Sequence, residues 1–135
     1  MKLKLLQIFL ISAAIGWGIS IYGVFSSWEQ AANQLKGLGA KEITYDPMLD
    51  YWLRMTAGAF TGIGIFFLSV AIKPKKFSSS IPLIGILLFI EGIVLVVHGF
   101  RLHLDPIPFY VDSAFCLING LGIWLLRNAV KSSSS

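Results

Sequence analysis

The sequence has little cysteine and little charge. Cys116 is the only cysteine among its 135 residues, which excludes an intramolecular disulfide, a paired-cysteine redox motif and a cysteine-based metal cluster. Charged residues make up only 13% of the chain, whereas hydrophobic residues make up 56% and the mean hydropathy is +0.75. Such a chain is too apolar for a soluble domain of its size, so the composition indicates a membrane protein that lies in a lipid bilayer.

The sequence also lacks the usual motifs of nucleotide and acyl-transfer chemistry. It has no P-loop, no nucleophile elbow and no dinucleotide fingerprint, because the sequence GIG at 62–64 lies deep in an apolar stretch instead of after a strand. A b-type haem usually takes histidines from facing helices, but His98 and His103 lie on or just after one predicted helix. A zinc site would need three or four converging ligands. We therefore expect no metal site and no cofactor.

The net charge of +4 does not indicate a nucleic-acid partner, because the basic residues are divided between predicted loops. With the amino terminus in the cytoplasm, seven lie on the cytoplasmic side: Lys2, Lys4, Lys73, Lys75, Lys76, Arg127 and Lys131. Four lie on or near the outer side: Lys36, Lys41, Arg54 and Arg101. This bias predicts that both termini are cytoplasmic.

Four stretches are long enough to span a bilayer, at about 5–26, 51–72, 81–100 and 107–126. The first resembles a signal peptide, but its apolar run is too long, so we expect an uncleaved span. We predict an all-α membrane protein with a single domain over 1–135, folded as a four-transmembrane-helix antiparallel bundle. The outer loop at 28–46 contains WEQAANQLK, which predicts a short surface helix that either caps the bundle or merely connects two spans.

Glycines in the predicted spans indicate where helices approach closely. Gly85, Gly92 and Gly99 recur at seven-residue spacing in the third span, which predicts a packing seam. Gly58 and Gly62 form a GxxxG pair in the second span, for which we also expect close helix packing. These seams could lie within one chain or between chains, so a homo-oligomer remains an alternative.

The second and fourth spans show an internal repeat. Both follow an Asp-Pro pair, at 46–47 and 105–106, that is typical of a helix start. Their ends, TGIGIFFLSVAIK (61–73) and NGLGIWLLRNAVK (119–131), align without gaps with six identities in thirteen positions. The alignment predicts two repeated helical hairpins and puts Arg54 opposite Asp112.

The stretch LFIEGIVLVVHGFR (88–101) carries the most informative polar residues. Glu91 and His98 are seven residues apart, so on a helix they share one face about 10 Å apart along the axis. An ionisable group at membrane depth is costly unless it faces the protein interior. We therefore expect Glu91 to be protonated, to be paired with Asn119, Thr61 or a basic group, or to line a wet cavity.

Counting along the helices puts Tyr22, Arg54, His98 and Asp112 in an outer layer and Glu91, Asn119 and Thr61 in a deeper one. Arg54 and Asp112 have three alternative roles: an ion pair between the second and fourth spans, ligand contact, or an Arg54 side chain that reaches the headgroups. His98 is either a proton-transfer partner or an interface residue. We expect Cys116 to be inert packing.

Size, span count and the glycine pattern RMTAGAFTGIGIFFL (54–68) resemble the DoxX-like group of small four-helix bacterial inner-membrane proteins. This resemblance implies a multi-pass protein of the bacterial cytoplasmic membrane. The small multidrug transporters also have four helices and a membrane glutamate, but theirs is in the first helix, whereas Glu91 is in the third.

Three functions remain open from the sequence. The leading hypothesis is a binding or accessory protein that holds a lipid, a quinone-like molecule, another small amphiphile or a partner helix in a pocket open to the outer side. The second is a proton-coupled transporter that uses Glu91. The third is a small intramembrane enzyme, an isomerase or hydrolase, that uses Glu91 and His98 as acid and base. The candidate ligand-binding residues are Tyr22, Arg54, Glu91, His98, Asp112 and Asn119.

Overall fold

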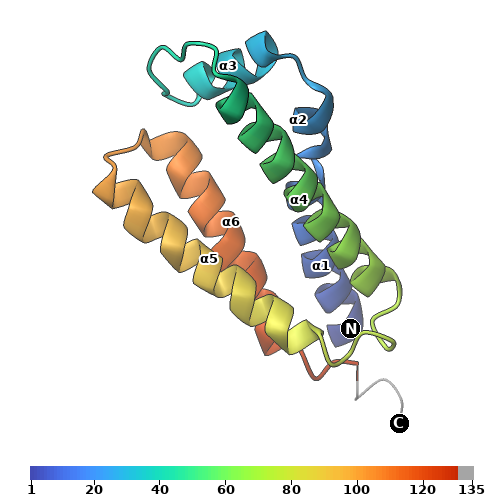
Figure 1. Ribbon diagram of the computed structural model, residues 1–135. Coiled ribbons are helices and arrows are strands. Elements are labelled where there is room, and N and C mark those ends of the chain that lie inside the picture. Colours follow the sequence, from blue (N-terminus) through green and yellow to red (C-terminus); the bar gives the residue numbers. More distant parts are fainter. Residues whose placement is uncertain (131–135) are drawn as a thin grey trace.

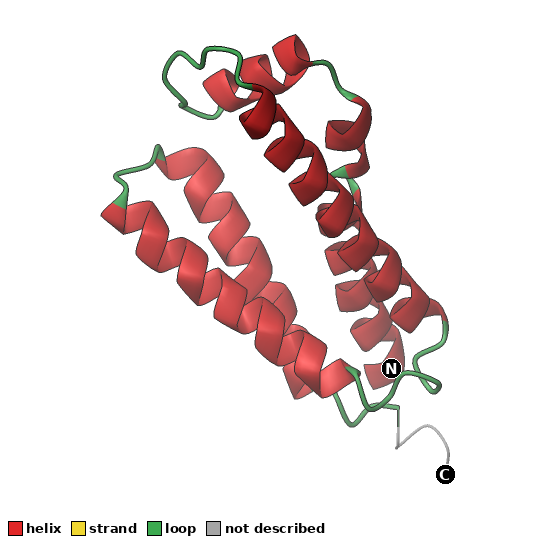
Figure 2. Cartoon of the chain, in the orientation of Figure 1, coloured by secondary structure: helices red, strands yellow, loops and turns green. Residues whose placement is uncertain are grey.

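The computed structural model describes residues 1–130, which form helices joined by turns and loops (Figure 2). Within this range the helices are α1 (Lys2–Gly18), α2 (Ile21–Phe25), α3 (Trp28–Gly37), α4 (Pro47–Ile72), α5 (Ile81–Arg101) and α6 (Pro106–Leu125). Four segments are long and apolar enough to cross a membrane, namely Lys2–Phe25, α4, α5 and α6. The predicted all-α class is confirmed, and these four segments indicate a multi-pass membrane protein. Lys131, which enters both the charge bias and the repeat, lies outside the described residues.

The helices pack as two pairs. α5 packs along α6, and α1 with α2 packs along α4, while α1 and α6 connect the pairs. The pairs lie close together near the amino terminus and diverge toward the end that carries α3 (Figure 1). We call the first the closed end (the start of α1 with residues 73–80 and 126–130) and the second the open end (residues 19–46 and 102–105).

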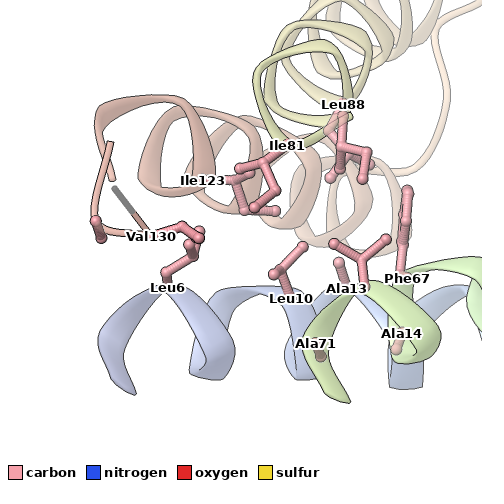
Figure 3. Packing of buried hydrophobic residues seen from close by; sticks show 13 residues of the cluster. Leu6, Leu10, Ala13, Ala14, Phe67, Ala71, Ile81, Leu88, Ile123 and Val130 are labelled. Atoms are coloured by element: carbon pink, nitrogen blue, oxygen red, sulfur yellow. The ribbon is translucent and has the colours of Figure 1, made fainter. Parts of the chain in front are cut away.

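A cluster of buried apolar side chains holds the closed end together. Leu6 and Leu10 of α1, Val70 of α4, Ile81 of α5 and Ile123 of α6 are all fully buried in it. The side chains from the two pairs interdigitate there (Figure 3). Because lipid is as apolar as these side chains, close packing rather than exclusion from water makes this contact favourable in a membrane.

The predicted glycine seam of α5 is confirmed. Gly85, Gly92 and Gly99 all face α6, where an added Cβ would overlap α6 atoms in every case. Gly120 of α6 makes the reciprocal approach, since a Cβ there would lie only 2.5 Å from the backbone nitrogen of Phe89. The missing side chains let the two backbones come into contact.

In the other pair the close approach is made by Gly64, not by the predicted GxxxG motif. A Cβ on Gly64 would lie 2.5 Å from the nitrogen of Gly18 and 2.9 Å from the oxygen of Ala14, both on α1. Among residues 1–130, nothing lies within 4 Å of a Cβ added to Gly58 or Gly62. The GxxxG pair therefore makes no close packing within the described chain, because Gly62 and Gly64 are two residues apart and point in nearly opposite directions, and packing of the pair between chains stays a prediction.

The crossings do not follow the predicted repeat. Aligned without gaps, Gly64 matches Gly122, but Gly122 lies against the ring of Phe9, and Gly120 makes the backbone contact. Equivalent positions therefore have different neighbours, and the duplication stays a prediction.

The two Asp-Pro pairs start helices in different ways. Asp46 caps α4 as predicted, because its carboxylate accepts hydrogen bonds from the backbone N–H groups of Met48 (2.7 Å) and Leu49 (3.1 Å). Asp105 precedes α6 but makes no capping hydrogen bond. Its carboxylate lies instead against Gly39, which has a φ of +96° that favours glycine.

The predicted surface helix is α3, which starts with a capping box. The Ser27 hydroxyl accepts from the Gln30 backbone, and the Gln30 side chain accepts from Ser27. The loop after α3 brings Gly39 against Asp105, in the connection between α5 and α6. α3 and this loop therefore bridge the two helix pairs at the open end, which favours the capping role over a mere connector.

Candidate functional site

A partly open chamber of about 280 Å³ lies between the two helix pairs, and all four long segments contribute to its lining. Its polar groups are Glu91 of α5, Asp112 and Cys116 of α6, and Ser20 from the turn between α1 and α2. Aromatic rings and Leu95 supply the rest of the wall. The chamber is therefore a small site with few polar groups in an apolar surround, as is usual for ligand pockets.

Glu91 lies at the middle of α5, ten residues from Ile81 and ten from Arg101, or about 15 Å from either end. Asp112 lies six residues after Pro106, about 9 Å into α6. Among residues 1–130 neither carboxylate makes a side-chain hydrogen bond or an ion pair. A lone charge at bilayer depth costs about 3 kcal/mol, so this pair calls for a compensating group.

Two buried polar atoms also lack partners. The indole N–H of Trp17, whose ring lines the chamber, and the Oδ1 atom of Asn119 have no hydrogen-bond partner within the described chain. An unsatisfied buried polar atom costs about 1–3 kcal/mol. The indole nitrogen itself is shielded, so Trp17 contributes its ring to the chamber wall.

An aromatic wall encloses the chamber. Trp17 of α1 and Phe60 of α4 meet edge to face, with ring centroids 4.8 Å apart and an interplanar angle of 89°. Phe115 of α6 lies directly over Gly16 of α1, where a Cβ would overlap its ring. The missing side chain at Gly16 thus makes room for the third ring of the wall.

The first membrane segment is interrupted beside the chamber, between Gly18 and Ile21. The Ser20 N–H bonds to the Trp17 carbonyl at 3.3 Å, one residue short of the α-helical register. Irregular backbone at membrane depth is tolerated where it lines a cavity. This turn lies within the first membrane segment and places Ser20 in the wall.

An apolar groove of about 430 Å³ adjoins the chamber between α4 and α5. It is lined by Ile63 and Phe66 of α4 and by α5 side chains from Leu83 to Ile90, with Ser80 at its closed-end limit. Glu91 and Trp17 line both the groove and the chamber. An apolar surface therefore leads to a carboxylate at the middle of the membrane segment.

On its other side the chamber adjoins a cavity of about 670 Å³ at the open end. Asp112 lines both spaces, and Gly37, Leu38 and Asp105 line the outer one. The three spaces thus follow one another from the open end to the groove. Asp112 stands at the first junction and Glu91 at the second.

The structure does not pair Arg54 with Asp112. The Arg54 guanidinium donates to the Asp50 carboxylate (2.7 Å), the Ser26 hydroxyl (2.9 Å) and the Gly23 carbonyl (2.7 Å). The ion pair between Arg54 and Asp112 that the repeat suggested is therefore wrong, because Asp50, one helical turn away on α4, binds the guanidinium instead of Asp112 on α6. Arg54 fastens α2 to α4 and does not line the chamber.

The other predicted residues are divided among different places. Tyr22 lines another cavity of about 720 Å³ between α2, α3 and α4, which shares Ser20 and Phe60 with the chamber. His98 is exposed and does not line the chamber, so it does not face Glu91 there. Asn119 is buried, but its amide donates to the Phe115 carbonyl, and Thr61 donates to Ala57. Neither is a partner of Glu91, which lines the chamber instead.

Sequence reasoning missed the aromatic wall. The position of Trp17 could have indicated this wall, because tryptophan is enriched at the membrane interfaces, whereas Trp17 lies deep in an apolar span. Phe60 and Phe115 gave no such indication, since phenylalanine is common throughout these spans.

Among residues 1–130, no group of three or more His, Cys, Asp and Glu side chains is placed to hold a metal ion. Comparison of the chain with protein-family models, with curated proteins and with solved structures finds no match.

Proposed function

We propose that the protein crosses the bacterial cytoplasmic membrane as an antiparallel four-helix bundle with its closed end in the cytoplasm. The amino terminus lies beside the connection between α4 and α5 (Figure 1), and that connection carries Lys73, Lys75 and Lys76. Basic residues gathered at one end favour a cytoplasmic location for that end. The choice of membrane rests on the DoxX-like resemblance of the sequence.

In this orientation the protein binds a small amphiphile between its two helix pairs. The observation that carries this function is that Glu91 and Trp17 line both the polar chamber and the apolar groove. A molecule with a polar head and an apolar chain matches both surfaces at once, and neither a wholly polar nor a wholly apolar ligand does so.

The lining also indicates what the head must offer. Ionised carboxylates accept hydrogen bonds, so Glu91 and Asp112 favour a head that donates. The apolar chain lies along α5 toward Ser80, and the head is reached from the outer side past Asp112.

Native mass spectrometry of the protein gently extracted from its own membrane tests this function. We expect a reproducible extra mass that is lost in Glu91→Gln and in Asp112→Asn. Glu42→Gln, in the exposed loop after α3, is the matched control and should keep the extra mass. A clean chain mass for the unsubstituted protein, or an extra mass that both chamber variants retain, would contradict amphiphile binding at this site.

A second candidate, a proton-coupled transporter, is favoured by the order of the three spaces. Asp112 adjoins the outer cavity and Glu91 adjoins a groove that reaches toward the closed end, so a ligand could pass from one carboxylate to the other. The other titratable groups of the chamber are Asp112 and Cys116. Glu91→Gln should then abolish the pH dependence of ligand release, and an unchanged pH dependence would rule this candidate out. The enzyme hypothesis has no comparable support, because it needs His98 beside Glu91.

A further inference from the structure

The composition of the chamber wall points to a particular class of head group. We propose that the bound amphiphile carries an ammonium cation, which lies between Glu91 and Asp112 and against the aromatic wall. This inference rests on the proposed function and narrows its ligand class. Three features of the lining carry it: its charge, its aromatic content and the shape of the space that continues from it.

All the ionisable groups of the lining are acidic in type. Glu91, Asp112 and Cys116 line the chamber, and among residues 1–130 no Lys, Arg or His does. Arg54, the cation that the sequence placed opposite Asp112, binds Asp50, Ser26 and Gly23 instead. An anionic head would meet two carboxylates without a counter-charge, whereas a cation is attracted by both and compensates the charge of one.

The aromatic wall is the second, independent feature. Trp17, Phe60 and Phe115 come from three different helices and line the same space as the carboxylates. The face of an aromatic ring attracts cations, tryptophan most strongly, and rings grouped around a small space are the usual receptor for alkylated ammonium groups. A neutral alcohol would gain neither this attraction nor charge compensation.

The groove explains why the cation would carry an apolar chain. Its wall between α4 and α5 is formed by side chains such as Ile63, Phe66 and Leu87, and it ends at Glu91 and Trp17. A single straight chain attached to the ammonium group would lie along α5 with its head at the middle of that helix. A compact organic cation without a chain would leave the groove unused.

Three ligands with the same ten-carbon chain and different heads test the inference: decylammonium, decanol and decanoate. Their equilibrium binding is measured below their micelle concentrations, on the protein in nanodiscs of uncharged net composition, with protein-free nanodiscs to subtract partition into lipid. We expect saturable binding of the ammonium ligand at one molecule per chain. Decanol and decanoate should bind at least tenfold more weakly.

Substitutions separate the contribution of the carboxylates from that of the aromatic wall. Glu91→Gln and Asp112→Asn should each weaken ammonium binding at least tenfold and change decanol binding less than threefold. Phe60→Leu keeps an apolar side chain but removes a ring face, so it should weaken ammonium binding threefold to tenfold and spare decanol. Retained decanol binding shows in each case that the variant is folded. Glu42→Gln should change nothing.

The outcomes are distinguishable. Equal binding of all three ligands, or ammonium binding that Glu91→Gln, Asp112→Asn and Phe60→Leu all leave intact, would overturn the ammonium class and leave amphiphile binding standing. Saturable binding of none of them to the unsubstituted protein would overturn the ammonium class and count against the proposed function as well. Preference for decanoate would also overturn the inference, since it would require a cation at the chamber.

Discussion

The four long segments pack closely against one another at the closed end, whereas cavities lie between the helices at the open end. At the closed end, side chains from both helix pairs interlock around Leu6, Leu10 and Ile123, all fully buried. Toward the open end the pairs separate, and cavities of about 670 and 720 Å³ lie between the helices and below α3. The difference shows how a short chain can combine stability with a binding site, because one end fixes the helices and the other leaves space between them.

The largest expected effect comes from the backbone crossings that hold each pair together. Gly120→Leu and Gly64→Leu would each place a side chain against backbone atoms of the facing helix, 2.5 Å from a nitrogen already at the Cβ position. We expect a loss of about 3 kcal/mol or more in the free energy of unfolding, measured by reversible unfolding in mixed micelles. Gly62→Leu, with nothing within 4 Å, is the control and should stay within about 0.5 kcal/mol. A comparable loss of unfolding free energy in Gly62→Leu would mean that this face of α4 packs against another helix.

A matched pair of leucines compares the two ends directly. Leu10→Ala removes a fully buried side chain at the closed end and should cost about 2.5 kcal/mol. Leu53→Ala removes one that lines the 720 Å³ cavity between α2, α3 and α4 and should cost less than about 1 kcal/mol, because much of its surface has no packed neighbour to lose. Equal losses in the same unfolding assay would show that the open end packs as tightly as the closed end.

Arg54 is the main polar fastening of the open end. Arg54→Leu removes its bonds to Asp50, Ser26 and the Gly23 carbonyl and should cost about 1 kcal/mol, since the ion pair is partly exposed. The effect should appear as faster hydrogen exchange in α2, with α5 and α6 unchanged. Arg101→Leu, at the exposed end of α5, serves as the control. Accelerated exchange throughout the chain would show that Arg54 acts on the whole fold.

The smallest effect on stability is expected at the chamber itself. Glu91→Gln removes a carboxylate that has no partner among residues 1–130, so the ligand-free protein should be unchanged or stabilised by up to about 1 kcal/mol. Thermal unfolding in detergent after ligand removal measures this. A clear destabilisation would instead assign Glu91 a structural bond within the fold.

The helices and one packing seam could be predicted from the sequence because they depend on local pattern. Apolar runs gave the four segments, the Asp-Pro pair gave the cap at Asp46, and seven-residue spacing gave the seam of Gly85, Gly92 and Gly99. In each case the signal lies within one helix. Spacing along a helix determines which residues share a face, and these predictions needed nothing more.

The errors arose where the answer depended on which helix lies opposite. Gly58 and Gly62 share a face, but that face of α4 does not meet α1. Arg54 was assigned a partner through a sequence repeat, whereas Asp50 on its own helix takes it. The chamber combines residues from four segments, so only Glu91 and Asp112, polar in an apolar context, could be recognised beforehand.

The most direct test of the central claim is labelling of a single cysteine in the chamber. In a Cys116→Ala background, Ser20→Cys places a thiol in the chamber wall, and Ala13→Cys places one in the fully buried closed-end core. Small charged methanethiosulfonate reagents are added from the outer side, one cationic and one anionic. After each rate is divided by that reagent's rate with a small thiol in solution, we expect the thiol at position 20 to react at least tenfold faster with the cationic reagent than with the anionic one, and the thiol at position 13 not to react. An unreactive thiol at position 20, or equal rates with both reagents, would contradict an acidic chamber that is open to the outer side.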